Sequence, residues 1–203
     1  MLVTDLIGRG AALFTVPDAD SRYGSRPATY EDIIGQQRHA EYLPSRFAVY
    51  KGLRLRGMSY ARIAKTTGKL CHSTIRNGVA RAEYTMERDP EYAFKVRYIH
   101  LLRNPQAPAT PAEVAEYVFG LLGAPWPFVD SRTTVERRAT AVAIEVMREL
   151  EVPARSIYNA FGMSNGWYHT HRNDYATHWR DQDYLADSAL AAARSMFEGG
   201  IDE

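Results

Sequence analysis

The sequence predicts an all-α protein made of two small tandem helical modules. Apolar residues recur mainly at helical spacing, and few segments show the alternating Val, Ile and Thr pattern that is typical of strands. Pro-rich stretches from Pro17 to Pro27 and from Asn104 to Pro111 interrupt the helical pattern. A helix-turn-helix pattern occurs at about residues 58–82, and a weaker copy occurs in the second half, so each module is expected to be built around a helix-turn-helix.

These interruptions divide the chain into five expected segments. Residues 1–29 form a short apolar segment followed by a loop, and residues 30–104 form the first module. A Pro-rich linker covers residues 105–111, and the second module follows over residues 112–195. A flexible tail is expected at residues 196–203, where two glycines precede two acids.

Composition argues against several classes of protein. Cys71 is the only cysteine, so no intrachain disulfide can form and nothing indicates an oxidising compartment. No apolar run is long enough to span a bilayer, and the amino terminus lacks the basic leader and cleavage pattern of a signal peptide. We therefore expect a cytoplasmic protein without a membrane partner.

Charge is divided unevenly along the chain. Residues 30–104 hold 14 Lys and Arg against 7 Asp and Glu, a net charge of +7, whereas residues 105–203 hold 8 Arg against 14 acids, a net charge of −6. Because phosphate neutralisation supplies most non-specific affinity for nucleic acid, the basic half predicts double-stranded DNA as a partner. The acidic half is a candidate surface for a protein partner, and solvated helix faces are the alternative explanation for both.

The first module is predicted to contain three consecutive helices. The first spans Pro44–Arg56, where proline suits the first turn and apolar residues follow at helical spacing. Ser59 can cap a short second helix, residues 60–67, and Gly68 stands where that helix should end. A third helix opens at about His72 and presents polar side chains from its first turn, as the second helix of a helix-turn-helix does.

This motif resembles a known DNA-binding domain. Residues 60–75 contain Gly68 followed by His72-Ser73-Thr74. The same residue types at the same spacing mark the carboxyl-terminal DNA-binding domain of the bacterial replication initiator DnaA, and the stretch is similar to that signature.

The resemblance covers about residues 30–100 and implies roles for individual side chains. It implies that Arg38 enters the minor groove, that the His-Ser-Thr signature faces the major groove, and that Arg46 contacts phosphate from a basic loop. Arginine suits a narrow minor groove, and short polar side chains suit base edges. The full set of expected DNA-binding residues in this module is Arg38, Arg46, Arg62, Lys65, Lys69, His72, Ser73, Thr74, Arg76, Asn77 and Arg81.

The sequence also departs from that family. Cys71 stands where the family has an acid, and Leu70 stands where it has a basic residue. An acid there can accept a hydrogen bond from cytosine, so its loss predicts that a different sequence is recognised. No G-x-x-x-x-G-K-[S/T] motif occurs, so no ATPase is present and no nucleotide cofactor is expected.

A weaker copy of the motif is predicted in the second module. An apolar helix, Arg137–Leu150, precedes a shorter helix that begins at Pro153. Gly162 follows Ile157 by five residues, as Gly68 follows Ile63 in the first module. Ser164 can cap the next helix. A diverged duplicate explains the match, and two unrelated hairpins are the alternative. The expected DNA-binding residues here are Arg132, Arg155, Asn165, Trp167, Tyr168, His169 and Arg172.

Two features raise competing predictions that the sequence does not favour. His171, Asp174 and His178 fall on one helix face at a spacing that suits a metal ion, but no second motif supports a metal-dependent enzyme, so no metal is expected. Aromatic side chains such as Tyr84 and Trp126 are expected to pack in cores rather than stack on single-stranded bases.

The sequence therefore predicts a non-enzymatic protein that binds double-stranded DNA in a sequence-dependent way and regulates replication or transcription. The alternative is an adaptor or scaffold whose acidic second module binds protein, such as a DNA-packaging subunit like a small terminase. A metal-dependent enzyme is the third alternative.

Overall fold

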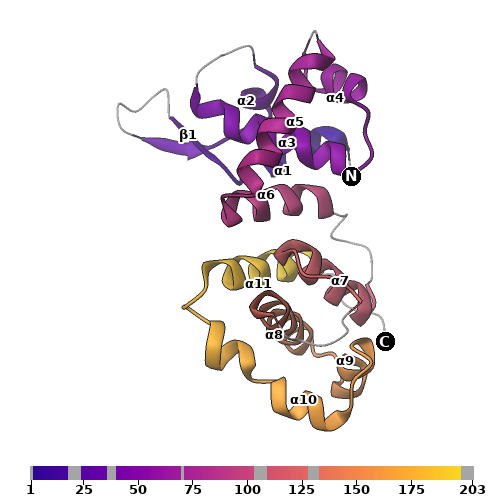
Figure 1. Ribbon diagram of the computed structural model, residues 1–203. Helices are drawn as coiled ribbons and strands as arrows, with labels where there is room; N and C mark the ends of the chain where they lie inside the picture. The colour runs from indigo at the N-terminus through magenta and orange to yellow at the C-terminus, as the bar shows by residue number, and fades with distance from the viewer. Residues whose placement is uncertain are drawn as a thin grey trace. The chain divides into compact units, whose positions relative to one another are not determined.

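The computed structural model describes residues 2–17, 24–35, 40–69, 71–102, 109–127 and 133–197. These residues are mainly helical, so the all-α prediction is confirmed. The chain divides into two compact units, Met1–Leu102 and Arg103–Glu203, here called unit 1 and unit 2 (Figure 1). Four parts of the sequence-based expectations lie outside the described residues: Arg38, Arg132, residues 105–108 of the expected linker and residues 198–203 of the expected tail.

Unit 1 combines helices with one short sheet. Its helices are α1 (Val3–Ala11), α2 (Tyr30–Ile34), α3 (Leu43–Leu55), α4 (Tyr60–Thr66), α5 (His72–Met86) and α6 (Pro90–Leu101), with a 3-10 turn at Ala40–Tyr42. The sheet pairs β1 (Thr15–Pro17) with β2 (Ser25–Pro27) in antiparallel register, Val16 opposite Arg26. The stretch expected to be a loop therefore begins and ends in paired strands.

The amino-terminal segment belongs to the core of unit 1. α1 packs against α2, α3 and α6, and it buries Leu6 and Ile7. Apolar residues three and four apart give this short helix one inward face. The boundary expected at residue 29 therefore does not separate α1 from the rest of the unit.

α3 is the helix on which the other helices of unit 1 assemble. It contacts α1, α2, α4, α5 and α6, and its Tyr50 and Leu53 are almost completely buried (Figure 1). Gly78 lets α5 approach α3 closely, because a Cβ atom there would lie 2.8 Å from ring carbons of both Phe47 and Tyr50.

Unit 2 is helical throughout its described residues. Its elements are α7 (Pro111–Leu122), α8 (Thr134–Glu149), α9 (Ala154–Ala160), α10 (Asn165–His171), a π-helical turn η2 (Tyr175–Trp179) and α11 (Tyr184–Phe197). α7, α8 and α11 contact one another around buried side chains that include Phe119, Ile144 and Leu190. α9 and α10 extend from the end of α8 and pack against each other (Figure 1).

Side-chain caps fix where the helices begin. Ser59 and Ser164, both expected as caps, accept hydrogen bonds from the backbone N–H groups of Arg62 and Trp167. Reciprocal capping boxes that the sequence analysis did not identify start three more helices: Thr29 with Asp32, Thr110 with Glu113, and Thr133 with Glu136. In the part of the chain that the structure describes, no helix is both long and apolar enough to cross a bilayer.

Candidate nucleic-acid interface

The predicted helix-turn-helix in unit 1 consists of α4, a tight turn and α5. Gly68 has φ +66°, a conformation that glycine adopts without strain, and the N–H of Lys69 donates to the carbonyl of Ala64 at 2.8 Å. Ile63 and Ile75 are fully buried where the two helices pack. This geometry holds α5 at a fixed angle with its first turn exposed.

The exposed side of α5 is polar and basic. His72 and Thr74 are exposed in its first turn, and Arg76, Asn77 and Arg81 continue the same side at helical spacing. Ser73 is half-buried, and its hydroxyl lies 2.8 Å from the thiol of the exposed Cys71. These side chains supply the hydrogen-bond donors and acceptors that base edges and phosphates require.

Tyr84 extends this exposed side and was missed from the sequence. It is 56% exposed, so the expectation that it packs in a core is wrong. The Arg88 guanidinium lies over its ring, with the carbon 3.6 Å from the centroid. Its spacing from Asn77 and Arg81 is helical, which is the signal that could have placed it on the exposed face.

A long acid-free stretch surrounds this motif. Between Tyr42 and Ala82 the chain holds nine Lys and Arg and no Asp or Glu. Arg62 and Lys65 project from the exposed side of α4 within this stretch. Of these cations, Lys51 pairs with Glu83 at 2.6 Å, and the segment as a whole keeps a net positive charge, which attracts a polyanion.

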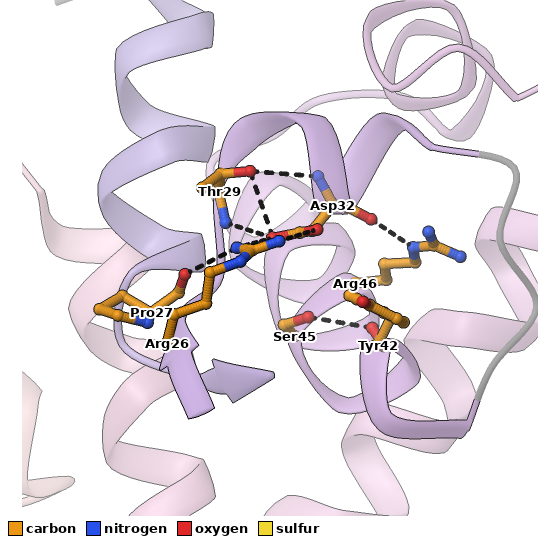
Figure 2. A network of polar contacts seen from close by, with 7 residues as sticks. All are labelled: Arg26, Pro27, Thr29, Asp32, Tyr42, Ser45 and Arg46. Atoms are coloured by element: carbon orange, nitrogen blue, oxygen red, sulfur yellow. Dashed lines mark hydrogen bonds and ion pairs between the residues drawn. The ribbon is translucent and has the colours of Figure 1, made fainter. Parts of the chain in front are cut away.

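Arg46 does not lie at a surface loop as the resemblance implied. It is inside α3 and only 5% exposed, and its Nε donates to the carbonyl of Asp32 at 2.8 Å (Figure 2). The carbonyls at the end of a short helix lack backbone donors, and a buried cation satisfies one of them here. The expected phosphate contact is therefore replaced by a structural one.

Lys69 has a similar structural role. Its Nζ donates to the carbonyls of Ile34 at 3.1 Å and Gly35 at 2.7 Å, and the side chain is half-buried. Burial lowers the pKa of the Lys69 ammonium, and the neighbouring charge of Arg46 lowers it further. Lys69 thus joins the turn of the helix-turn-helix to the end of α2.

Asp32 is the centre of the polar network that anchors α2. Its carboxylate accepts two hydrogen bonds from Arg26, at 2.7 and 3.0 Å, and one from the N–H of Thr29 at 2.8 Å (Figure 2). Hydrogen bonding to Arg26 holds the pKa of the Asp32 carboxyl below its usual value despite burial. With Arg46 on its backbone carbonyl, Asp32 ties β2 and α2 to α3.

Unit 2 contains a turn between helices with the same local geometry. Ile157 is fully buried as Ile63 is, and Gly162 has φ +65° as Gly68 has +66°. The N–H of Met163 donates to the carbonyl of Tyr158 at 2.9 Å, which matches the hydrogen bond that closes the first turn. Each of these positions lies 94 residues after its counterpart in unit 1.

Two residues expected to bind DNA in unit 2 are packed inward instead. Tyr168 is 6% exposed, and Trp167 is half-buried against the rings of Phe161 and His171, with centroids 5.4 and 4.9 Å away. Trp126, half-buried, lies in the same cluster beside Phe161. The aromatic side of α10 faces this cluster because α10 has little other core to cover.

The remaining expected residues of unit 2 are exposed. Arg155, Asn165, His169 and Arg172 lie at the surface. Asn173 and Thr170 are exposed beside them and were missed. Asn173 follows His169 by four residues, as His169 follows Asn165, and this period was the available signal.

The candidate metal ligands do not assemble into a cluster. His171 Nδ1 lies 2.7 Å from a carboxylate oxygen of Asp174. Across the ranges that the structure describes, no group of three or more His, Cys, Asp or Glu side chains is placed to hold a metal ion. His171 instead contributes its ring to the stack with Trp167.

Comparisons of this chain with models of protein families, with curated proteins and with solved structures gave no match.

Proposed function

We propose that this chain is a non-enzymatic, sequence-dependent binder of double-stranded DNA that uses α4 and α5 to regulate replication or transcription in the cytoplasm. The observation that carries the proposal is the exposed polar and basic side of α5, which stands on a buried helix-turn-helix core within an acid-free stretch of the chain. The resemblance of residues 60–75 to the initiator domain agrees with it.

The side chains of α5 divide by chemistry into two groups. His72, Thr74 and Asn77 are short and uncharged or weakly basic, so they suit hydrogen bonds to base edges in the major groove. Arg76 and Arg81 suit phosphates, as do Arg62 and Lys65 on α4 (both exposed). Arg46 and Lys69 are not assigned to the interface, because both donate hydrogen bonds to backbone carbonyls at the end of α2.

The packing of α5 against α3 favours recognition of bases over sequence-independent electrostatic binding. α5 is 15 residues long and lies along α3 with Gly78 at the contact (Figure 1). Reading base edges requires side chains held in register with the groove, which a packed helix provides and a mobile basic tail does not.

The two units are also proposed to be diverged copies of one module. The matched buried isoleucines, left-handed glycines and turn hydrogen bonds support a common origin more directly than a shared helical class does.

The acidic composition of unit 2 favours a second candidate function. Residues 105–203 carry a net charge of −6, which suits an adaptor or DNA-packaging subunit whose second half binds protein. In that function α4 and α5 still bind DNA, and unit 2 recruits a partner.

Selection of bound sequences from a random duplex pool by the full chain tests the proposal. Sequence-dependent binding predicts enrichment of a defined motif over successive rounds. Binding without enrichment, or no binding, contradicts it. Selection with His72→Ala and Thr74→Ala combined is the matched control, and it should weaken the enrichment at the base pairs that α5 reads and leave general binding nearly unchanged.

A further inference from the structure

The backbone of unit 2 repeats that of unit 1 beyond the turn itself. Glu151 has φ +60° where Gly57 has +84°, a conformation that residues other than glycine adopt at a cost. The N–H of Val152 donates to the carbonyl of Met147 at 2.9 Å, as Met58 donates to Leu53 at 3.2 Å. With the turn after α9, the correspondence runs over residues 147–163 and 53–69 at a constant offset.

The charge pattern of unit 2 changes at this repeated segment. From Val152 to Asn173 there is no Asp or Glu, although the unit is acidic as a whole. Arginines elsewhere in the unit pair with its acids: Arg138 with Asp183, Arg148 and Arg180 with Glu145, and Arg194 with Glu149. α9 and α10 themselves therefore carry no acid; the nearest acids in sequence are Glu151 and Asp174, and Asp174 lies 2.7 Å from His171 at the end of α10.

The exposed side of α10 has the composition of a base-reading surface. Asn165 and His169 lie four residues apart with Thr170 beside them, and Asn173, in the turn that follows α10, continues the four-residue spacing. Asparagine can form two hydrogen bonds with adenine. The hydroxyl of threonine can hydrogen-bond a base, and its methyl group can contact the methyl group of thymine. Arg155, exposed in the first turn of α9, adds a cation suited to phosphate.

The same surface is poorly suited to a protein partner. Protein interfaces need large apolar or aromatic anchors at their centre. The exposed large apolar side chains among the described residues are Leu2, Leu55, Tyr84, Val135 and Tyr184, and none of them lies on α9 or α10. Of the large aromatic residues of α10, Trp167 packs against Phe161 and Tyr168 is buried.

We propose that α9 and α10 form a second interface with double-stranded DNA, at which Asn165, His169, Thr170 and Asn173 face base edges. This inference rests on the proposed function of α4 and α5, and it makes the chain a bivalent binder of one duplex. α10 has seven residues where α5 has 15, and a π-helical turn follows it, so the second interface covers fewer base pairs.

The test uses the full chain and a duplex that it selects from a random pool. Hydroxyl-radical footprinting should show two protected segments. Asn165→Ala combined with His169→Ala should remove protection from one segment and lower affinity for the duplex by about tenfold or more. Gln182→Ala, at an exposed position outside α9 and α10, should change neither.

Charge variants give a second, independent measurement. Arg155→Ala combined with Arg172→Ala should reduce the slope of log affinity against log salt by about 0.9 for each phosphate that is no longer neutralised. Arg137→Ala is the matched control, because Arg137 is also exposed but lies near the start of α8, about 20 Å along the helix from the end that leads to α9. Unchanged Trp fluorescence verifies that the cluster containing Trp167 is intact.

The outcomes separate this inference from the function on which it rests. If the α10 and arginine variants bind and protect the duplex as the unaltered chain does, the second interface is absent and the α4–α5 proposal stands. If the combined His72 and Thr74 variant leaves both protected segments intact, the proposed function itself fails. A chain that protects no duplex at all overturns both.

Discussion

Replacing Gly78 with alanine tests the packing that mounts α5 on α3. The new Cβ would lie 2.8 Å from ring carbons of Phe47 and Tyr50, closer than such atoms approach in proteins, so the rings or the helix must move. Overpacking of this kind costs about 1–3 kcal/mol. Alanine gains about 0.8–1.0 kcal/mol over glycine in a helix interior, so the net loss of unfolding free energy is at most about 2 kcal/mol.

Gly8→Ala is the matched control for this prediction. Gly8 also lies in a helix of unit 1, but a Cβ there would meet nothing within 4 Å. It should therefore show the propensity gain alone. Because that gain is common to both variants, their unfolding free energies should differ by the steric cost, about 1–3 kcal/mol.

Urea unfolding followed by two signals measures the difference. The three Trp residues, Trp126, Trp167 and Trp179, all belong to unit 2, so Trp fluorescence reports that unit alone. Far-UV circular dichroism reports both units. Gly78→Ala should shift only the part of the dichroism transition that fluorescence does not follow. If Gly78→Ala is stabilised as much as Gly8→Ala, α5 does not lie against α3 as described.

Three further predictions concern the network and the basic surface of unit 1. Hydrogen bonding to Arg26 lowers the folded pKa of the Asp32 carboxyl from 3.8, so the carboxylate stabilises unit 1 above that pH, and this stabilisation is lost as the pH falls through the folded pKa. In urea unfolding, Asp32→Asn should lower the unfolding free energy by about 1–2 kcal/mol at pH 7, and this loss should shrink as the pH falls below 3.8. Lys69→Met should lower the unfolding free energy of unit 1 by about 1–3 kcal/mol, because two backbone carbonyls lose their donor. Lys65→Met, at an exposed position, should change thermal stability little and lower DNA affinity. Arg76→Ala combined with Arg81→Ala should reduce the salt slope of duplex binding by about 0.9 for each phosphate left unbound, in titrations at several salt concentrations, and an unchanged slope would remove both from the phosphate contacts.

The helices and their turns were predictable because their signals are local. Ser59 and Gly68 mark the start of one helix and the turn after it, and each does so through its own backbone or side-chain geometry. Ile157 and Gly162 carried the same information for unit 2, which is why the second turn could be placed despite little other similarity.

The roles of the cations were not predictable in the same way. Arg46 was expected at a phosphate from the resemblance to the initiator domain, and Lys69 was expected to bind DNA as a cation of the helix-turn-helix. Both instead bind carbonyls at the end of α2, a contact across 14 residues for Arg46 and about 35 for Lys69, and sequence pattern does not encode such distant pairings. Trp167 and Tyr168 were misplaced for a related reason, since the packing of Trp167 against Phe161 and the burial of Tyr168 depend on tertiary contacts of α10.

The ratio of affinities for a selected duplex and a scrambled duplex tests the central claim most directly. Replacing His72 and Thr74 with alanine removes exposed side chains and no core contact, so the variant should fold normally. The account predicts that this ratio falls by the equivalent of about 1–3 kcal/mol for each side chain that reads a base, while affinity for the scrambled duplex is nearly unchanged. Arg62→Ala, as the control, should weaken both duplexes equally and preserve the ratio. A His72 and Thr74 variant that keeps the full ratio would show that α5 does not read the sequence.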